Sequence, residues 1–203
     1  MATLRAAVAA LSCLGFAGVG TSPAPAAAPN VTFTAAGTFA STPTSGSDSL
    51  KLANEPFTIS VVANAAAVPI SHGPNWAVFS PLKMTGVVHS GLLGPTPVSI
   101  ASYAAGIEQL VGPQFDEFVL AVPVRIVGIN LTIHATVFMP PGTIPNQLIH
   151  IFGPVPMNPS TATVTYSDGY NTTSLAIQTG TLSATVTGSS KNTVVRLGAL
   201  RNP

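Results

Sequence analysis

The chain has 203 residues, only 6% of them charged, with seven Lys or Arg against six Asp or Glu. This composition excludes the dense basic surface that nucleic-acid binding requires, because such binding depends on neutralising phosphates. The length suits one domain whose apolar core needs no disulfide, and a surface so poor in charge has little to oppose self-association.

The first 28 residues have the features of a secretory signal peptide. Arg5 supplies the positive charge, and residues 6–19 form an apolar segment. A small-residue cleavage site is offered by Ala24-Pro25-Ala26 or by Ala26-Ala27-Ala28. The apolar segment is shorter than the roughly 20 residues that span a bilayer, so we expect export and no transmembrane span. An uncleaved buried helix is the alternative.

The only cysteine, Cys13, lies inside this leader. The preceding Ala10-Leu11-Ser12 partly resembles a bacterial lipoprotein box, so lipidation of Cys13 is an open alternative to simple secretion. We expect one secreted or cell-surface domain over residues 29–203. Because this part contains no cysteine, disulfides, thiolate metal sites and cysteine nucleophiles are excluded from it.

The mature chain begins with alternating patterns typical of half-buried strands. Residues 30–40 alternate apolar side chains with threonine, and residues 57–63 alternate in the same way. A Ser/Thr/Gly/Pro-rich loop is expected over residues 41–49, followed by a short strand at residues 50–52. Short strands at this spacing predict a sandwich.

Prolines limit the strands over residues 68–97 to short runs, such as residues 76–79 and 83–89. The single tryptophan, Trp76, has two interpretations: a core residue between sheets, or an exposed platform for a sugar or an aromatic partner. Residues 104–111 contain only two β-branched side chains, Ile107 and Val111, and are the one candidate for a short helix.

The most apolar segment, residues 115–139, predicts strands rather than a membrane helix. Val, Ile and Thr dominate it, and Pro123 would break a helix. Apolar side chains occupy even positions before Gly128 and odd positions after it. Since a one-residue shift moves side chains to the opposite face, we expect a bulge or tight turn at Gly128.

Residues 161–187 predict three antiparallel strands with a threonine-coated outer face and an inward Tyr166. We expect one turn at residues 167–169 and a second at residues 178–180, because both contain glycine and polar residues. The Pro-rich residues 153–159 before this unit predict a loop.

No catalytic or metal-binding motif is recognisable. The four histidines, which are His72, His89, His134 and His150, have no metal-ligand spacing, although the sequence leaves open whether they cluster in space. Asp116 and Glu117 are adjacent, and strand alternation would send them to opposite faces. We expect no cofactor and no catalytic residue. The candidate ligand-binding residues are the aromatic platforms Trp76, Tyr103 and Tyr170, with Tyr166 ranked lower.

Two segments resemble uncharacterised exported β-sandwich proteins of bacteria. They are Val-Thr-Phe-Thr-x-x-Gly-Thr-Phe at residues 31–39 and Thr-Val-Thr-Tyr-Ser-Asp-Gly at residues 163–169. The resemblance implies a fold and no activity. Some proteins of this style carry a C-terminal sorting helix, and no such pattern follows residue 187.

We therefore expect an all-β fold: a single antiparallel β-sandwich, immunoglobulin-like in style, of roughly eight to twelve strands. The expected function is a non-catalytic structural or adhesive module that associates with itself, with cell-envelope polysaccharide or with a partner protein. The alternative is a carbohydrate-binding module or secreted sugar-active hydrolase. A metal-dependent hydrolase built from the histidines is a third hypothesis.

Overall fold

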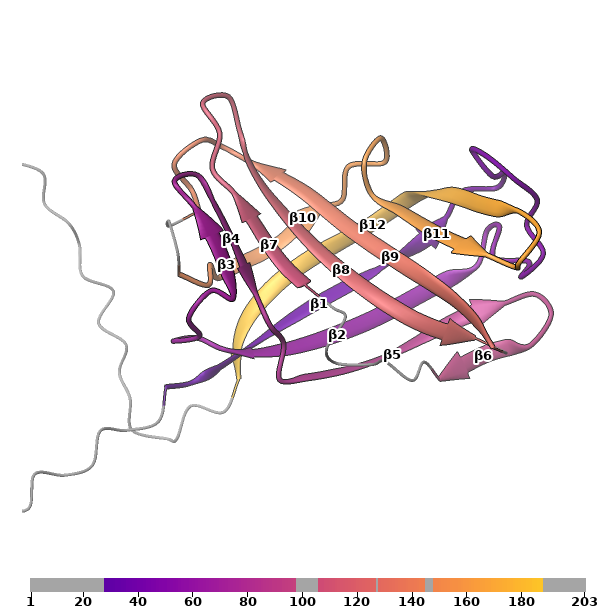
Figure 1. Ribbon diagram of the computed structural model, residues 1–203, viewed down its shortest axis with the longest axis horizontal. Helices are drawn as coiled ribbons and strands as arrows, with labels where there is room; N and C mark the ends of the chain where they lie inside the picture. Colours follow the sequence, from indigo (N-terminus) through magenta and orange to yellow (C-terminus); the bar gives the residue numbers. More distant parts are fainter. Residues whose placement is uncertain (1–27, 98–105, 127, 145–147, 188–203) are drawn as a thin grey trace, which may run out of the picture.

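A computed structural model of the protein describes residues 28–97, 106–126, 128–144 and 148–187. These residues form twelve strands, all paired antiparallel, and no helix, so the predicted all-β sandwich is confirmed (Figure 1). None of them forms a helix of the length and hydropathy that crossing a membrane requires. The strands are β1 (Asn30–Phe39), β2 (Pro56–Asn64), β3 (Ser71–Gly73), β4 (Trp76–Phe79), β5 (Lys83–Ser90), β6 (Gly94–Pro97), β7 (Gly106–Leu110), β8 (Asp116–Ile126), β9 (Ile129–Met139), β10 (Phe152–Pro156), β11 (Thr163–Ser167) and β12 (Thr172–Thr187).

The strands make one open sheet that folds over into two layers. Its order is β3-β4-β7-β8-β9-β11-β12-β1-β2-β5-β6, and β10 pairs with β12 outside this path. We call β3, β4, β7, β8, β9 and β11 the front layer, because they cross in front of β1, β2 and β5 in Figure 1. The rear layer consists of β1, β2, β5, β6, β10 and the second half of β12.

Strand β12 joins the two layers. Its residues 172–176 pair with β11, and its residues 177–187 pair with β1. The turn predicted at residues 178–180 is therefore wrong, because the chain bends there without leaving the strand. Thr38 pairs with Thr179, whereas the next residue of β1 pairs with Ile177, so Gln178 is an extra residue in the ladder. Such a bulge bends a strand and increases its twist.

Two glycines make room for this bend. Gly37 of β1 pairs with Gly180 of β12, and the two backbones approach closely. A Cβ on Gly180 would lie 2.6 Å from the carbonyl oxygen of Ala36 and would also collide with the Met157 side chain. The bend therefore requires glycine for close approach rather than for a turn conformation.

The core lies between the layers and is built from the inward side chains of both. Phe33 of β1 and Phe118 of β8 are fully buried, and their rings stack with centroids 5.2 Å apart. Phe152 of β10 meets Phe118 edge-on at 5.1 Å. Burial of each such side chain contributes about 1.5–3 kcal/mol, so these contacts hold the layers together.

Loop residues 41–55 close one end of the sandwich through Asp48. Its carboxylate accepts hydrogen bonds from the backbone amides of Leu52 and Ala53 at 3.0 and 2.8 Å and from the Tyr166 hydroxyl at 2.9 Å. Tyr166 is buried, which confirms its predicted inward orientation. Asp48 therefore fastens the loop to β11.

Polar side chains close the other end in the same way. The buried Gln109 of β7 donates to the carbonyl oxygen of Leu148 at 2.8 Å and accepts from the amide of His150 at 3.0 Å. The buried Asp116 of β8 accepts from the amide of Ile144 at 2.8 Å. No buried side-chain nitrogen or oxygen of the described residues lacks a hydrogen bond. These inward polar groups therefore stabilise the fold by binding the backbone of the loops.

Two further expectations are decided here. Gly128 does mark a tight turn, because Ile126 pairs with Ile129 and Gly128 has a φ of 84°. The helix expected at residues 104–111 is wrong, since β7 occupies residues 106–110 between β4 and β8. Pairing on both sides outweighs the weak helical preference of this segment.

The edge strands are short or rich in proline. β3 has three residues, β6 contains Pro95 and Pro97, and β10 contains Pro154 and Pro156. β10 also lies where a loop was expected. Proline has no amide hydrogen to donate to another strand, so these edges are poorly suited to pairing with a second chain.

Tyr166→Phe should lower the free energy of unfolding by about 1–2 kcal/mol, because the substitution removes a hydrogen bond to a charged acceptor. Urea unfolding measures the change. Tyr170→Phe is the matched control, since Tyr170 is 94% exposed. Equal stability of the two variants would show that the hydrogen bond between Tyr166 and Asp48 contributes nothing.

Gly180→Ala should destabilise the fold by about 1–3 kcal/mol, since the new methyl group has no space at the β12 bend. Gly153→Ala on β10 is the control, because a Cβ there meets no atom within 4 Å. Thermal unfolding of both variants measures the difference, and an unchanged Gly180→Ala protein would contradict the proposed role of the glycine pair.

Candidate functional site

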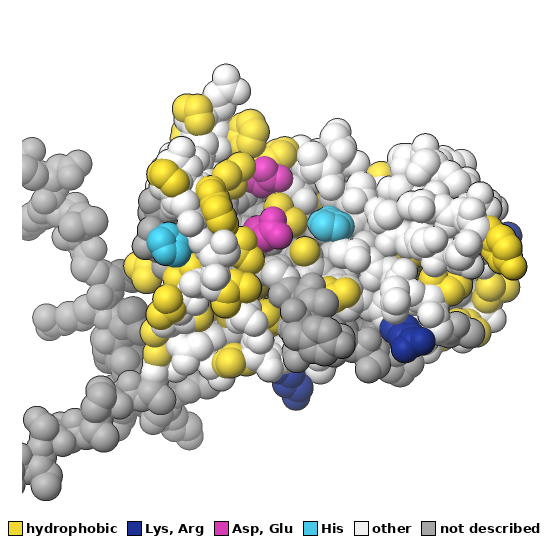
Figure 2. Space-filling view, in the orientation of Figure 1, with side chains coloured by type: hydrophobic (Ala, Val, Ile, Leu, Met, Phe, Trp, Pro, Cys, Tyr) yellow, Lys and Arg dark blue, Asp and Glu magenta, His cyan; other side chains and the backbone are white. Residues whose placement is uncertain are grey.

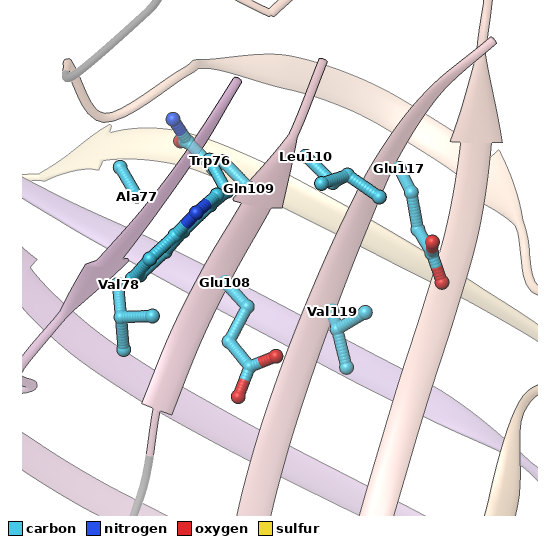
Figure 3. A pocket seen from close by; sticks show the side chains of 8 residues that line it. All are labelled: Trp76, Ala77, Val78, Glu108, Gln109, Leu110, Glu117 and Val119. Atoms are coloured by element: carbon cyan, nitrogen blue, oxygen red, sulfur yellow. The ribbon is translucent and has the colours of Figure 1, made fainter. Parts of the chain in front are cut away.

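A shallow depression lies on the outer face of the front layer, across β4, β7 and β8 (Figure 3). Its volume is about 270 Å³, slightly below the roughly 300–1,000 Å³ typical of pockets for drug-sized ligands. Its lining consists of Trp76, Ala77, Val78, Glu108, Gln109, Leu110, Glu117 and Val119.

Strand register determines which side chains meet in this depression. One row across the strands contains Trp76, Leu110, Glu117 and Phe138, and the next contains Val78, Glu108, Val119 and Thr136. Side chains at alternate positions share a face, so both rows lie on the outer face of the front layer, although Thr136 is buried there. Glu108 and Glu117 are diagonal neighbours on adjacent strands, within reach of each other's charge.

Trp76 forms one wall of the depression. Its side chain is 39% exposed, so it lies at the surface of the front layer rather than in the core. A Cβ on Gly73 would collide with the indole Nε1, which means that the ring rests on the backbone of β3. Figure 3 shows the indole edge-on, with Glu108 and Val119 to one side. The ring is thus held in place on one face and open to the depression on the other.

Among the described residues, the lining of the depression has two carboxylates and no Lys or Arg. No hydrogen bond or ion pair to Glu108 or Glu117 forms among the described residues. Burial, and then repulsion from Glu108, raise the pKa of Glu117. Arg125 lies on the same strand, but eight residues from Glu117, or about 27 Å at roughly 3.4 Å per residue. In Figure 2 the acidic side chains lie beside a hydrophobic group, and the basic side chains lie near the rims.

Tyr170, the other aromatic candidate that the structure describes, does not join Trp76. Tyr103 lies outside the described residues. Tyr170 lies in the confirmed turn between β11 and β12, where Asp168 accepts hydrogen bonds from the amides of Asn171 and Tyr170. These bonds lower the pKa of Asp168. The turn follows the end of β11 that pairs with Leu131, far from Phe138 in the Trp76 row, so Tyr170 is a separate surface feature.

The histidines do not form a metal site in the part of the chain that the structure describes. No group of three metal-ligating side chains exists there. The His150 ring stacks on Phe152 with centroids 5.7 Å apart, and burial lowers its pKa although Asp116 acts in the opposite direction. His134 lies on the outer face of β9, opposite Ala121.

Sequence reasoning missed Glu108, Leu110, Glu117 and Val119 as members of one site. The expected helix at residues 104–111 concealed the outward alternation of Glu108 and Leu110. The opposed orientation of Asp116 and Glu117 was predicted and is confirmed, since Asp116 is buried whereas Glu117 lines the depression. The signal that could have found the site is the alternation of residues 106–110, read as a strand.

No known protein family, no curated protein and no solved structure matches the sequence. The chemistry of the depression must therefore be inferred from its own residues. An indole wall, an apolar floor and two carboxylates suit a small ligand with one apolar face and several hydrogen-bond donors.

Glu117→Gln should stabilise the protein near pH 7. Because the pKa of Glu117 is raised in the folded state, ionising this carboxyl costs more in the folded protein than in the unfolded chain. The parent protein therefore loses stability as the pH rises above the ordinary pKa of 4.5. The neutral amide of Gln avoids this loss. The free energy of unfolding of the variant should therefore exceed that of the parent near pH 7 and equal it near pH 4. Urea unfolding at both pH values measures the effect. Glu55→Gln, which removes one charge elsewhere, is the control, and an equal gain at both pH values would contradict the explanation.

Proposed function

We propose that this protein is a secreted, non-catalytic binding module that holds carbohydrate in the depression beside Trp76. The observation that carries the proposal is the half-exposed indole, fixed against Gly73 and open to two carboxylates. A sugar ring offers an apolar face for the indole and hydroxyl groups that donate to carboxylates. The signal peptide features support a location outside the cell, where such polymers occur.

Binding is favoured over hydrolysis by the arrangement of the carboxylates. A glycosidase places its two carboxyl groups on either side of the scissile bond. Glu108 and Glu117 project from the same face of one sheet, with Val119 between them (Figure 3). No described residue donates a hydrogen bond to either group.

The rear layer supports a second candidate, an adhesive contact with a polymer surface. Its outer face carries a row of hydroxyl side chains in register across four strands, formed by Ser183, Thr34, Ser60 and Thr85. Such a row can hydrogen-bond a regular polysaccharide without any charge. Self-association through strand edges receives less support, because the described edges carry prolines or are short.

Trp76→Ala should weaken glycan binding at least about fivefold, since a central aromatic contact commonly contributes more than about 1 kcal/mol. A glycan array identifies ligands, and calorimetry compares the variants. Trp76→Phe should retain part of the affinity, and Tyr170→Ala should retain all of it.

Two results would contradict the proposal. Undiminished binding by Trp76→Ala would move the site elsewhere, with the hydroxyl face of the rear layer as the next candidate. Release of shorter sugars from a bound oligosaccharide, seen by chromatography and lost in Glu117→Gln, would indicate a hydrolase.

A further inference from the structure

The charge of the depression narrows the class of sugar. Glu108 and Glu117 face the same space, and no described cation neutralises them. The three described basic residues, Lys51, Lys83 and Arg125, lie on other parts of the molecule. A ligand that enters the depression therefore meets two negative charges beside an aromatic face.

A cationic group would be attracted both to the two carboxylates and to the aromatic face of Trp76. An ammonium ion is attracted to carboxylates, and it is also attracted to the face of an indole within about 6 Å of the ring. Burial, and after it repulsion from Glu108, raise the pKa of Glu117. A positive ligand would relieve this repulsion, whereas a neutral ligand would leave it.

The apolar part of the lining indicates a ligand that has apolar surface in addition to an amino group. Val78, Leu110 and Val119 lie among the charged groups and form apolar surface that a small hydrated cation would not cover. A pyranose ring with an amino group has an apolar face for Trp76 and a positive charge for the carboxylates.

We propose that the ligand is an amino sugar, bound with its ring on Trp76 and its ammonium group between Glu108 and Glu117. This inference rests on the proposed carbohydrate-binding function and specifies its substrate class. No bond is made or broken.

The site suits an oligomer better than a single sugar. The row that begins at Trp76 ends at Phe138, three strand spacings or about 14 Å away. Phe138 contacts the 42% exposed Phe115, with ring centroids 4.6 Å apart. A second aromatic surface is thus present beyond Glu117, where a neighbouring sugar ring can pack.

Two oligosaccharides that differ in N-acetylation, and therefore in charge, test the inference: a β-1,4-linked glucosamine hexamer and its fully N-acetylated counterpart. Trp76 is the only tryptophan of the chain, so its fluorescence reports binding at the site directly. At low salt and mildly acidic pH, where the glucosamine amino groups are protonated, the glucosamine hexamer should bind at least about five- to tenfold more tightly than the acetylated one, and added salt should reduce the difference.

Charge-neutralising variants locate the effect. Glu108→Gln and Glu117→Gln should each weaken binding of the glucosamine hexamer about five- to tenfold, and should weaken binding of the acetylated hexamer less, because only the glucosamine hexamer loses an attraction between opposite charges. Glu55→Gln, with the same change in net charge elsewhere, should bind like the parent. Spermidine, which has charge and no sugar ring, should bind more weakly than the glucosamine hexamer.

Several results would overturn the inference. Equal affinity for the two hexamers, or tighter binding of the acetylated one, would show a neutral-sugar site and would leave the carbohydrate proposal standing. Spermidine binding as tight as that of the glucosamine hexamer would show attraction to charge alone. An equal loss in Glu55→Gln would show that overall charge, not this pair, is responsible. If no carbohydrate bound in a Trp76-dependent way, both proposals would fail together.

Discussion

The close contact between Gly37 and Gly180 is the constraint on which the remaining structure depends. It lets β12 bend at Gln178 and pass from the front layer to the rear layer while remaining paired. A strand shared by both layers replaces a crossing loop and brings their inner faces together. The aromatic contact between Phe33 and Phe118 follows from this closure, because the two residues come from opposite layers. The core therefore depends on the bend, and the site depends on the core.

Polar groups have different uses inside and outside this sandwich. Asp48, Gln109 and Asp116 turn toward the ends of the core, and each binds backbone groups of a loop. Their hydrogen-bonding capacity is used in closing the fold, as expected of buried polar side chains. Glu108 and Glu117 face outward without such partners among the described residues. This contrast distinguishes groups that hold the structure from groups available to a ligand.

The depression is a product of strand neighbourhood rather than of any local motif. Trp76, Glu108 and Glu117 come from three strands, and only their pairing puts them on one face. No local motif in the sequence links these three residues. Gly73 matters for a similar reason, because its missing side chain lets the indole rest against β3. A site of this kind is open and shallow, which suits binding of an extended polymer.

Periodicity in the sequence was sufficient to predict most of the strands, the outward threonines, the inward Tyr166 and the turn at Gly128, because each depends on neighbours along the chain. The strand expected at residues 50–52 does not form, and β10 lies where a loop was expected. Periodicity also failed at residues 104–111 and 178–180, where the outcome depends on partners distant in sequence. A glycine within a polar triplet is typical of a turn and of a bulge alike. Only the pairing of β12 with β1 shows that this triplet forms a bulge. The strand order decided the site as well, since the diagonal meeting of Glu108 and Glu117 exists only once β7 lies beside β8. Side-chain alternation is a local property, whereas adjacency in a sheet is set by burial of the whole core.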